Sequence, residues 1–170
     1  HSAKLGFAFG AGLFLTSTHW LYVSIHIFGQ APWFIAVLLM FGLVFIMALY
    51  YAAIGWLISK ISGRKPWVFL AVAPNIWIIF EWLRAWFLSG FPWMTLGYSQ
   101  IDSTLAGFAP LAGVFSVSLM LVTSASAILV SLMSISVRRY IALFIAVVPW
   151  VVGGAFRTVD WTEPAGAPVR

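Results

Sequence analysis

The stretch WFIAVLLMFGLVFIMALYYAAIGWLI, at residues 33–58, decides the fold class because it contains no charged side chain. A helix needs about 20 mostly apolar residues to span the hydrocarbon core of a bilayer. The stretch exceeds that length, and its apolar residues follow one another without the alternation that strands of a membrane barrel show. It is therefore predicted to be a membrane-spanning helix.

Four further stretches have the same character. They lie at about residues 5–27, 67–88, 105–134 and 140–156. Pro110 and Gly113 interrupt the third of these, which leaves open a short re-entrant or interfacial piece before Pro110. We therefore predict an all-α integral membrane protein, in which residues 1–156 form a bundle of about five transmembrane helices with an aromatic loop on its outer face.

The composition excludes a soluble globular domain. Hydrophobic residues make up 63% of the chain and charged residues only 8%, whereas a soluble domain carries about 25% charged residues. The chain has no cysteine, so it holds no disulfide, no thiolate metal site and no cysteine nucleophile. The net charge of +5 would also suit a nucleic-acid partner, but the spread of the basic residues between apolar stretches indicates membrane topology instead.

The basic residues sort to one side of the predicted membrane. Six of them precede the first stretch or lie between the second and third and between the fourth and fifth, namely Lys4, Lys60, Arg64, Lys65, Arg138 and Arg139. With five crossings these positions share one face, and no acid lies there. The positive-inside rule places this face and the N-terminus in the cytoplasm. The loop at residues 89–104 and the tail at residues 157–170 are then expected on the outer side.

Two charged residues, Glu81 and Arg84, lie inside the stretch at 67–88. They are three residues apart and share one helix face, and a charge in the hydrocarbon costs about 2.5–3.5 kcal/mol on insertion scales. An internal ion pair that fixes helix packing would explain them. Alternatively, Arg84 faces an outer-leaflet cavity and holds an anionic lipid phosphate, while Glu81 orients its guanidinium.

The loop that follows, GFPWMTLGYSQID at residues 90–102, combines aromatic and polar side chains. Its Pro92 and its glycines end the helix. Phe91, Trp93 and Tyr98 resemble the aromatic belt that anchors membrane proteins at the interface. A belt does not explain the polar residues grouped with them, Gln100 and Asp102. The loop is therefore a candidate for lining the mouth of a lipid pocket.

The first stretch carries a second group of interfacial side chains. Trp20 and Tyr22 lie near its outer end and are expected to anchor it at the interface. His19 and His26 are seven residues apart and share a face, but no carboxylate or third ligand accompanies them. We expect hydrogen-bonded packing of the histidines, and we predict no metal site and no cofactor.

Two groups of motifs resemble the apolipoprotein N-acyltransferase family. The first is EWLRAW at residues 81–86, followed by GFPW at 90–93 and GYSQ at 97–100. The second is WLYVSI at residues 20–25, followed by Gly29, which is similar to an earlier membrane signature of that family. Both groups occur in the order and spacing of the family, and the resemblance covers essentially the whole chain.

The resemblance implies an enzyme of the bacterial inner membrane. Such enzymes transfer an acyl chain from a glycerophospholipid to the α-amino group of the N-terminal diacylglyceryl-cysteine of a lipoprotein. Their helical membrane scaffold carries a periplasmic nitrilase-like domain with a Glu-Lys-Cys triad that forms a thioester. That triad maps onto no position here, because cysteine is absent and every lysine lies on the predicted cytoplasmic side.

The chain is therefore expected to be the membrane scaffold only and to be catalytically inactive by itself. Residues 157–170 are expected to form a periplasmic linker towards a catalytic domain that lies outside this chain. By the same resemblance, Trp93 with Phe91 and Pro92 matches the loop at the membrane entrance, where it would guide acyl chains. Arg84 and Glu81 match a helix-end motif that contacts a lipid headgroup or supports the loop. The full candidate lipid-binding set is Trp93, Phe91, Pro92, Arg84, Glu81, Tyr98, Gln100, Trp20 and Tyr22.

Two other functions are compatible with an apolar helical chain. One is a small transporter or channel subunit that uses Glu81, Arg84 and the histidines as a polar pathway. The other is a structural module that binds a partner helix. A pathway needs polar residues through the full depth of the bilayer, but the stretches at 33–58 and 140–156 are almost entirely apolar. This distribution favours the scaffold.

Overall fold

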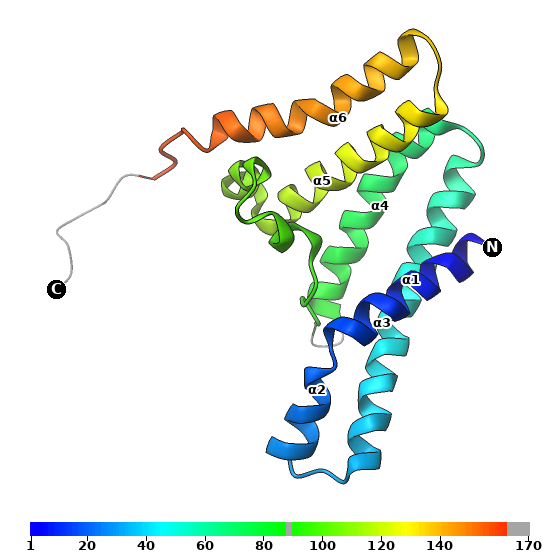
Figure 1. Ribbon diagram of the computed structural model, residues 1–170, viewed down its shortest axis with the longest axis vertical. Helices are drawn as coiled ribbons and strands as arrows, with labels where there is room; N and C mark the ends of the chain where they lie inside the picture. Colours follow the sequence, from blue (N-terminus) through cyan, green and yellow to red (C-terminus); the bar gives the residue numbers. More distant parts are fainter. Residues whose placement is uncertain (88–89, 163–170) are drawn as a thin grey trace, which may run out of the picture. The chain divides into compact units, whose positions relative to one another are not determined.

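The computed structural model describes residues 1–87 and 90–162, and every regular element in them is a helix (Figure 1). In chain order they are α1 (Ser2–Ser17), α2 (Trp20–Val23), the π-helix η1 (Ser24–Phe28), α3 (Trp33–Ser62), α4 (Pro66–Trp86), the 3₁₀ helices η3 (Leu96–Gln100) and η4 (Thr104–Phe108), α5 (Ala109–Met133) and α6 (Val137–Phe156). The predicted all-α membrane fold is confirmed.

Within these residues, 4 helical segments are long and apolar enough to cross a bilayer: α3, α4, residues 104–133 and α6. Large apolar side chains on them face outwards, with exposed fractions of 70% for Leu38, 72% for Leu132 and 69% for Phe144. A surface of this kind would be unstable against water over so large an area. It fits contact with lipid tails.

The first predicted helix, at residues 5–27, is divided in the structure. α1 ends at Ser17, and α2 and η1 follow after Thr18 and His19. The hydroxyl of Thr18 donates to the carbonyl of Phe14 at 2.6 Å, and that of Thr16 donates to Gly12 at 2.9 Å. Such back-bonded side chains bend helices. The three short helices all contact α3, so the divided segment still follows it (Figure 1).

The other boundaries differ by a few residues. α3 continues to Ser62 and α6 begins at Val137, so both extend into the basic turns beyond the predicted limits of 58 and 140. Lys and Arg side chains can reach the interface from within a helix, which lengthens it beyond the apolar run. In the fourth stretch, η4 precedes α5, and the helix is interrupted at Ala112 and at Gly113, whose φ of +63° suits glycine.

The chain forms two compact units, and the first comprises residues 1–94. Its core gathers side chains from α1, α3 and α4: Phe14, Val44, Met47, Tyr51, Ile54 and Ile76. α1 and α3 approach closely because glycine lies at their contact. A Cβ on Gly6 would lie 2.2 Å from the carbonyl oxygen of Tyr51, and one on Gly55 would lie 2.7 Å from that of Ser2. The two helices are therefore antiparallel, with the start of α1 beside the end of α3.

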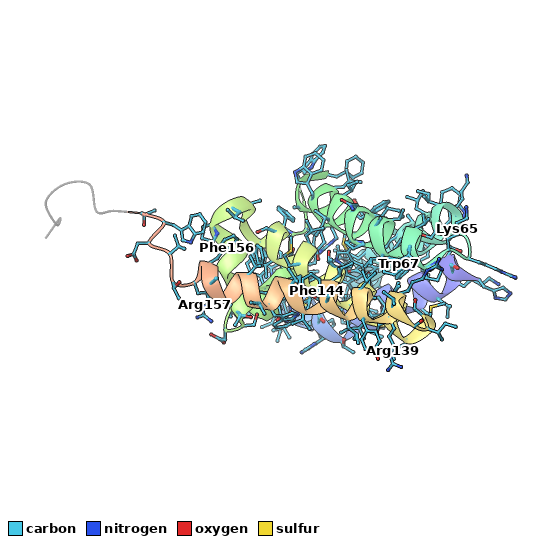
Figure 2. All side chains as sticks on the ribbon, turned by 90° about the horizontal axis from the view of Figure 1, so that it is seen from above. Lys65, Trp67, Arg139, Phe144, Phe156 and Arg157 are labelled. Carbon is cyan, nitrogen blue, oxygen red and sulfur yellow. The ribbon has the colours of Figure 1, made fainter. Side chains whose placement is uncertain are left out.

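The second unit begins at Thr95 and consists of η3, η4, α5 and α6. Leu105, Phe108 and Val117 form its core. η4 meets α6 backbone to backbone, since a Cβ on Gly107 would lie 2.0 Å from the carbonyl oxygen of Gly153. Figure 2 shows Arg139 and Arg157 at opposite ends of α6.

Candidate functional site

The two charged residues of α4 lie inside the first unit. The exposed fractions are 3% for Glu81 and 2% for Arg84. The Nη1 atom of Arg84 donates to the carbonyl of Phe91 at 2.9 Å and also to that of Trp93. The backbone amide of Phe91 in turn donates to the carbonyl of Arg84 at 2.8 Å. Arg84 therefore holds the loop after α4 through both its side chain and its backbone.

The loop after α4 turns back to Arg84 through two residues with positive φ, Gly90 and Met94. Gly90 has a φ of +75°, and a Cβ there would lie 2.1 Å from the carbonyl oxygen of Ala85. Only glycine fits this position without displacing the end of the helix. Met94 has a φ of +61°, which is uncommon for a residue with a side chain. Such strained positions persist where the surrounding contacts determine the backbone.

An aromatic cluster builds on this loop. The rings of Phe91 and Trp93 stack with centroids 5.2 Å apart, and the ring of Trp20 on α2 lies 5.9 Å from that of Trp93. Phe14 of α1 packs on Phe91 at 6.1 Å and lies under the guanidinium of Arg84 at 5.5 Å. The Trp93 side chain is 52% exposed. The site therefore offers an accessible indole ring on a fixed backbone.

Further side chains surround the buried charges. Tyr51 of α3 is 4% exposed, and its ring lies 6.0 Å from that of Phe14, the residue under the guanidinium of Arg84. Trp77 packs edge-on against Tyr51 with ring centroids 5.4 Å apart. The Nη2 atom of Arg84 is buried and has no hydrogen-bond partner in the described part of the chain. A guanidinium buried in this way is better placed to support the loop than to reach a lipid phosphate.

The predicted site residues divide between the two units. The first unit brings together Arg84, Phe91, Trp93 and Trp20. Pro92 is exposed and lies between Phe91 and Trp93 in the chain. Tyr22 instead packs on His26, with ring centroids 5.3 Å apart. It therefore takes no part in the aromatic cluster.

Tyr98 and Gln100 belong to η3 in the second unit. Tyr98 is 62% exposed, and the amide of Gln100 donates to the hydroxyl of Ser99 at 3.0 Å. The backbone amide of Gly97 donates to the hydroxyl of Ser118 at 2.7 Å, which fixes η3 against α5. Next to η3, the carbonyl of Asp102 accepts a hydrogen bond from Arg157 at 3.3 Å.

Phe14 and Tyr51 were missed by sequence reasoning. Tyr51 carries a weak signal, because its hydroxyl lies in the middle of the most apolar stretch. Phe14 carries none, since it is one of several phenylalanines in an apolar helix.

Each histidine of the first stretch bonds to the backbone, as predicted. His19 Nδ1 lies 2.9 Å from the carbonyl oxygen of Thr16, and His26 Nδ1 lies 2.8 Å from that of Ala31. In residues 1–87 and 90–162, no three His, Cys, Asp or Glu side chains gather as metal ligands would.

Residues 1–127, which include every candidate site residue, match the model of the apolipoprotein N-acyltransferase N-terminal domain. The chain belongs to this family. Proteins named apolipoprotein N-acyltransferase are 37% identical to it in Vibrio cholerae, 39% in Nitrosomonas europaea and 42% in Azotobacter vinelandii. These alignments cover 96%, 99% and 97% of the chain, but only 32%, 34% and 33% of the respective relatives.

The chain thus spans about a third of the length of these N-acyltransferases. The resemblance drawn from the motifs is confirmed, and the helices place it among membrane proteins. Within the matched segment of this chain, the loop after α4 carries the hydrogen bonds from Arg84 and the aromatic cluster.

Proposed function

We propose that this chain is the membrane scaffold of an apolipoprotein N-acyltransferase. The parent enzyme would transfer an acyl chain from a glycerophospholipid to the N-terminal diacylglyceryl-cysteine of a lipoprotein. The observation that carries the proposal is the exposed Trp93 ring on a loop held by the buried Arg84, inside the segment that matches the family. The chain has no cysteine, so a cysteine thioester would form elsewhere in the parent protein, and the chain alone would be inactive.

The physical role of such a scaffold is to position the donor lipid. An acyl chain must remain in apolar surroundings while its ester reaches a nucleophile above the membrane. Trp93, Phe91 and Trp20 provide an aromatic surface at which the chain can rest, and the fixed loop avoids an ordering cost when the lipid arrives. Positioning of this kind raises the effective concentration of the reacting groups. In this scheme Arg84 supports the loop and does not itself contact the lipid headgroup.

We also propose an orientation in the bacterial inner membrane. The N-terminus would be cytoplasmic, and residues 89–104 and the tail at 157–170 would be periplasmic. The first unit supports this, because the start of α1 lies beside the end of α3, which brings Lys4 to the same end as Lys60 and Lys65. The aromatic loop follows the opposite end of α4. The periplasmic tail would then lead to the catalytic domain of the parent enzyme.

Replacing Trp93 in the full-length parent tests the proposal. Trp93→Ala is expected to lower the rate of acyl transfer to a lipoprotein by about tenfold or more, which corresponds to about 1.4 kcal/mol of transition-state stabilisation. Insertion and folding should stay normal, because the side chain is half exposed. Trp33→Ala is the matched control, since Trp33 is 64% exposed on α3 and lies outside the cluster. Unchanged transfer by Trp93→Ala would remove the role of the loop.

A further inference from the structure

A crevice of about 470 Å³ opens between α1, α3 and α4 of the first unit, towards their basic end. Its walls are chiefly apolar and include Leu5, Phe9, Ile54, Ile58 and Phe69. The volume is in the range of pockets that hold small molecules, about 300–1,000 Å³. Two of the lining side chains, Leu5 and Phe9, are 72% and 55% exposed. The crevice is therefore accessible sideways, from the lipid that surrounds the helices.

The length of the crevice corresponds to one leaflet of a bilayer. It extends along α3 from Ser62 to Tyr51. These residues are eleven positions apart, or about 16 Å at 1.5 Å per residue. The hydrocarbon core of a bilayer is about 30 Å thick, so half of it matches this length. An acyl chain that starts at the basic end would reach the level of Tyr51 and Trp77.

A polar group lies unused at the basic end of the crevice. Ser62 is 4% exposed, and its buried hydroxyl has no hydrogen-bond partner among the described residues. A buried hydroxyl without a partner is destabilising. The ester carbonyl of a glycerolipid is an acceptor that would lie between the headgroup and the acyl chain, at the depth where this donor is found.

The charges at this end select the kind of lipid. Lys4, Lys60, Arg64 and Lys65 are exposed, and the first acid along the chain is the buried Glu81. Lys60 is held over the ring of Trp56 at 4.7 Å, and Figure 2 shows Lys65 at the start of α4. Basic residues near a membrane surface attract anionic lipids by about 1 kcal/mol each.

We propose that this crevice binds one anionic phospholipid, with an acyl chain between α1, α3 and α4 and the phosphate against the basic end. The mouth of this site lies at the opposite end of the helices from the aromatic loop, and only its inner end reaches Tyr51 and Trp77. The site is therefore distinct from the proposed donor entrance. The lipid would fill the crevice between helices and give Ser62 its acceptor.

Photocrosslinking tests the occupant directly. The chain is reconstituted in vesicles that contain phosphatidylglycerol with a photoreactive group on one acyl chain, and labelled residues are mapped by mass spectrometry. We expect the label to concentrate on the crevice walls, including Ile54 and Ile58. An even distribution of the label over exposed side chains such as Leu38 would overturn the proposal.

Two pairs of variants sharpen this test. Ile58→Phe fills the crevice and is expected to lower crevice labelling about fivefold or more. Ile61→Phe is the matched control, because the Ile61 side chain is 55% exposed on the same helix, and it should leave the labelling unchanged. Arg64→Gln with Lys65→Gln should reduce the preference for phosphatidylglycerol over phosphatidylcholine about fivefold. Arg138→Gln with Arg139→Gln is the matched control in the other unit.

Arg64 and Lys65 lie on the surface, so their double variant still measures the lipid preference if Ile58→Phe fails to fold. A preference unaffected by the loss of Arg64 and Lys65 would overturn the assignment to an anionic lipid. Trp93→Ala distinguishes the crevice proposal from the proposed role of the aromatic loop in acyl transfer. It is expected to lower acyl transfer by the parent enzyme and to leave crevice labelling intact, so each proposal can fail without the other.

Discussion

The two ends of the first unit use basic side chains in opposite ways. At one end Lys60, Arg64 and Lys65 are exposed, and the ammonium of Lys60 lies over the ring of Trp56 at 4.7 Å. At the other end Arg84 is only 2% exposed, and its guanidinium donates to two backbone carbonyls. In the proposed orientation the exposed charges would lie at the membrane surface, whereas the buried charge holds the backbone of the loop. The difference follows from the cost of leaving a buried guanidinium without acceptors.

The largest effect is expected from removing the buried charge. Arg84→Ala leaves the carbonyls of Phe91 and Trp93 without their donor, and hydrogen bonds to charged groups contribute about 1.5–3 kcal/mol each. We expect the unfolding free energy in detergent, followed by circular dichroism, to fall by about 3 kcal/mol. Arg84→Lys should recover part of the loss, because a lysine has the charge but not the planar fork.

Lys60→Ala is the control at the exposed end and should change the unfolding free energy by no more than about 0.5 kcal/mol. Equal losses for Arg84→Ala and Lys60→Ala would contradict the comparison between the two ends.

The next effect concerns the turn that brings the loop to Arg84. Gly90→Ala introduces a Cβ that would lie 2.1 Å from the carbonyl oxygen of Ala85, at a φ of +75°. We expect a loss of about 1–3 kcal/mol in the same denaturation measurement. Gly42→Ala on α3 is the matched control, because its Cβ would meet nothing within 4 Å. That variant should be neutral or stabilising by up to about 1 kcal/mol.

A smaller effect is expected from the partner of Trp93. Trp20→Ala removes one ring contact, and aromatic pairs are worth about 0.5–1.5 kcal/mol beyond their buried area. Acyl transfer by the parent enzyme should fall less than it does in Trp93→Ala. Tyr22→Ala removes an aromatic ring from the same helix but leaves the cluster unchanged. If both variants lowered transfer equally, Trp20 would have no specific place in the cluster.

The smallest structural effect, and a direct test of orientation, comes from single cysteines. The chain has none of its own, so Tyr98→Cys and Lys60→Cys each introduce one reactive thiol at an exposed position. With a maleimide that does not cross membranes, Tyr98→Cys should react in intact cells, whereas Lys60→Cys should react only after permeabilisation. Labelling of Lys60→Cys in intact cells would refute the proposed topology.

Hydropathy alone was sufficient to predict α3, α4 and α6, because a long apolar run with few or no charged residues has few alternatives to a spanning helix. The charge pair of α4 was also recognisable, since a charge is costly in that position. The break at Thr18 was not predicted, because Thr and Ser are common in apolar helices and bend them only when their hydroxyls bond back to the backbone.

The role of Arg84 depends on the tertiary path of the chain. Its sequence position predicts a special environment, but the acceptors are backbone carbonyls of residues that carry no polar signal, Phe91 and Trp93. Phe14 and Tyr51 were missed for a similar reason. Phe14 lies under the guanidinium of Arg84 and packs on Tyr51, and both contacts depend on how α1 packs in the folded unit.

The contact between Gly107 and Gly153 has an evolutionary consequence. A methyl group on Gly107 would collide with the carbonyl oxygen of Gly153, and one on Gly153 would lie 2.5 Å from that of Thr104. A mutation at either position cannot be rescued by trimming a neighbouring side chain, because the obstacle is main chain. Related sequences that keep this arrangement should retain glycine at both positions, and those that lose one must displace a whole helix.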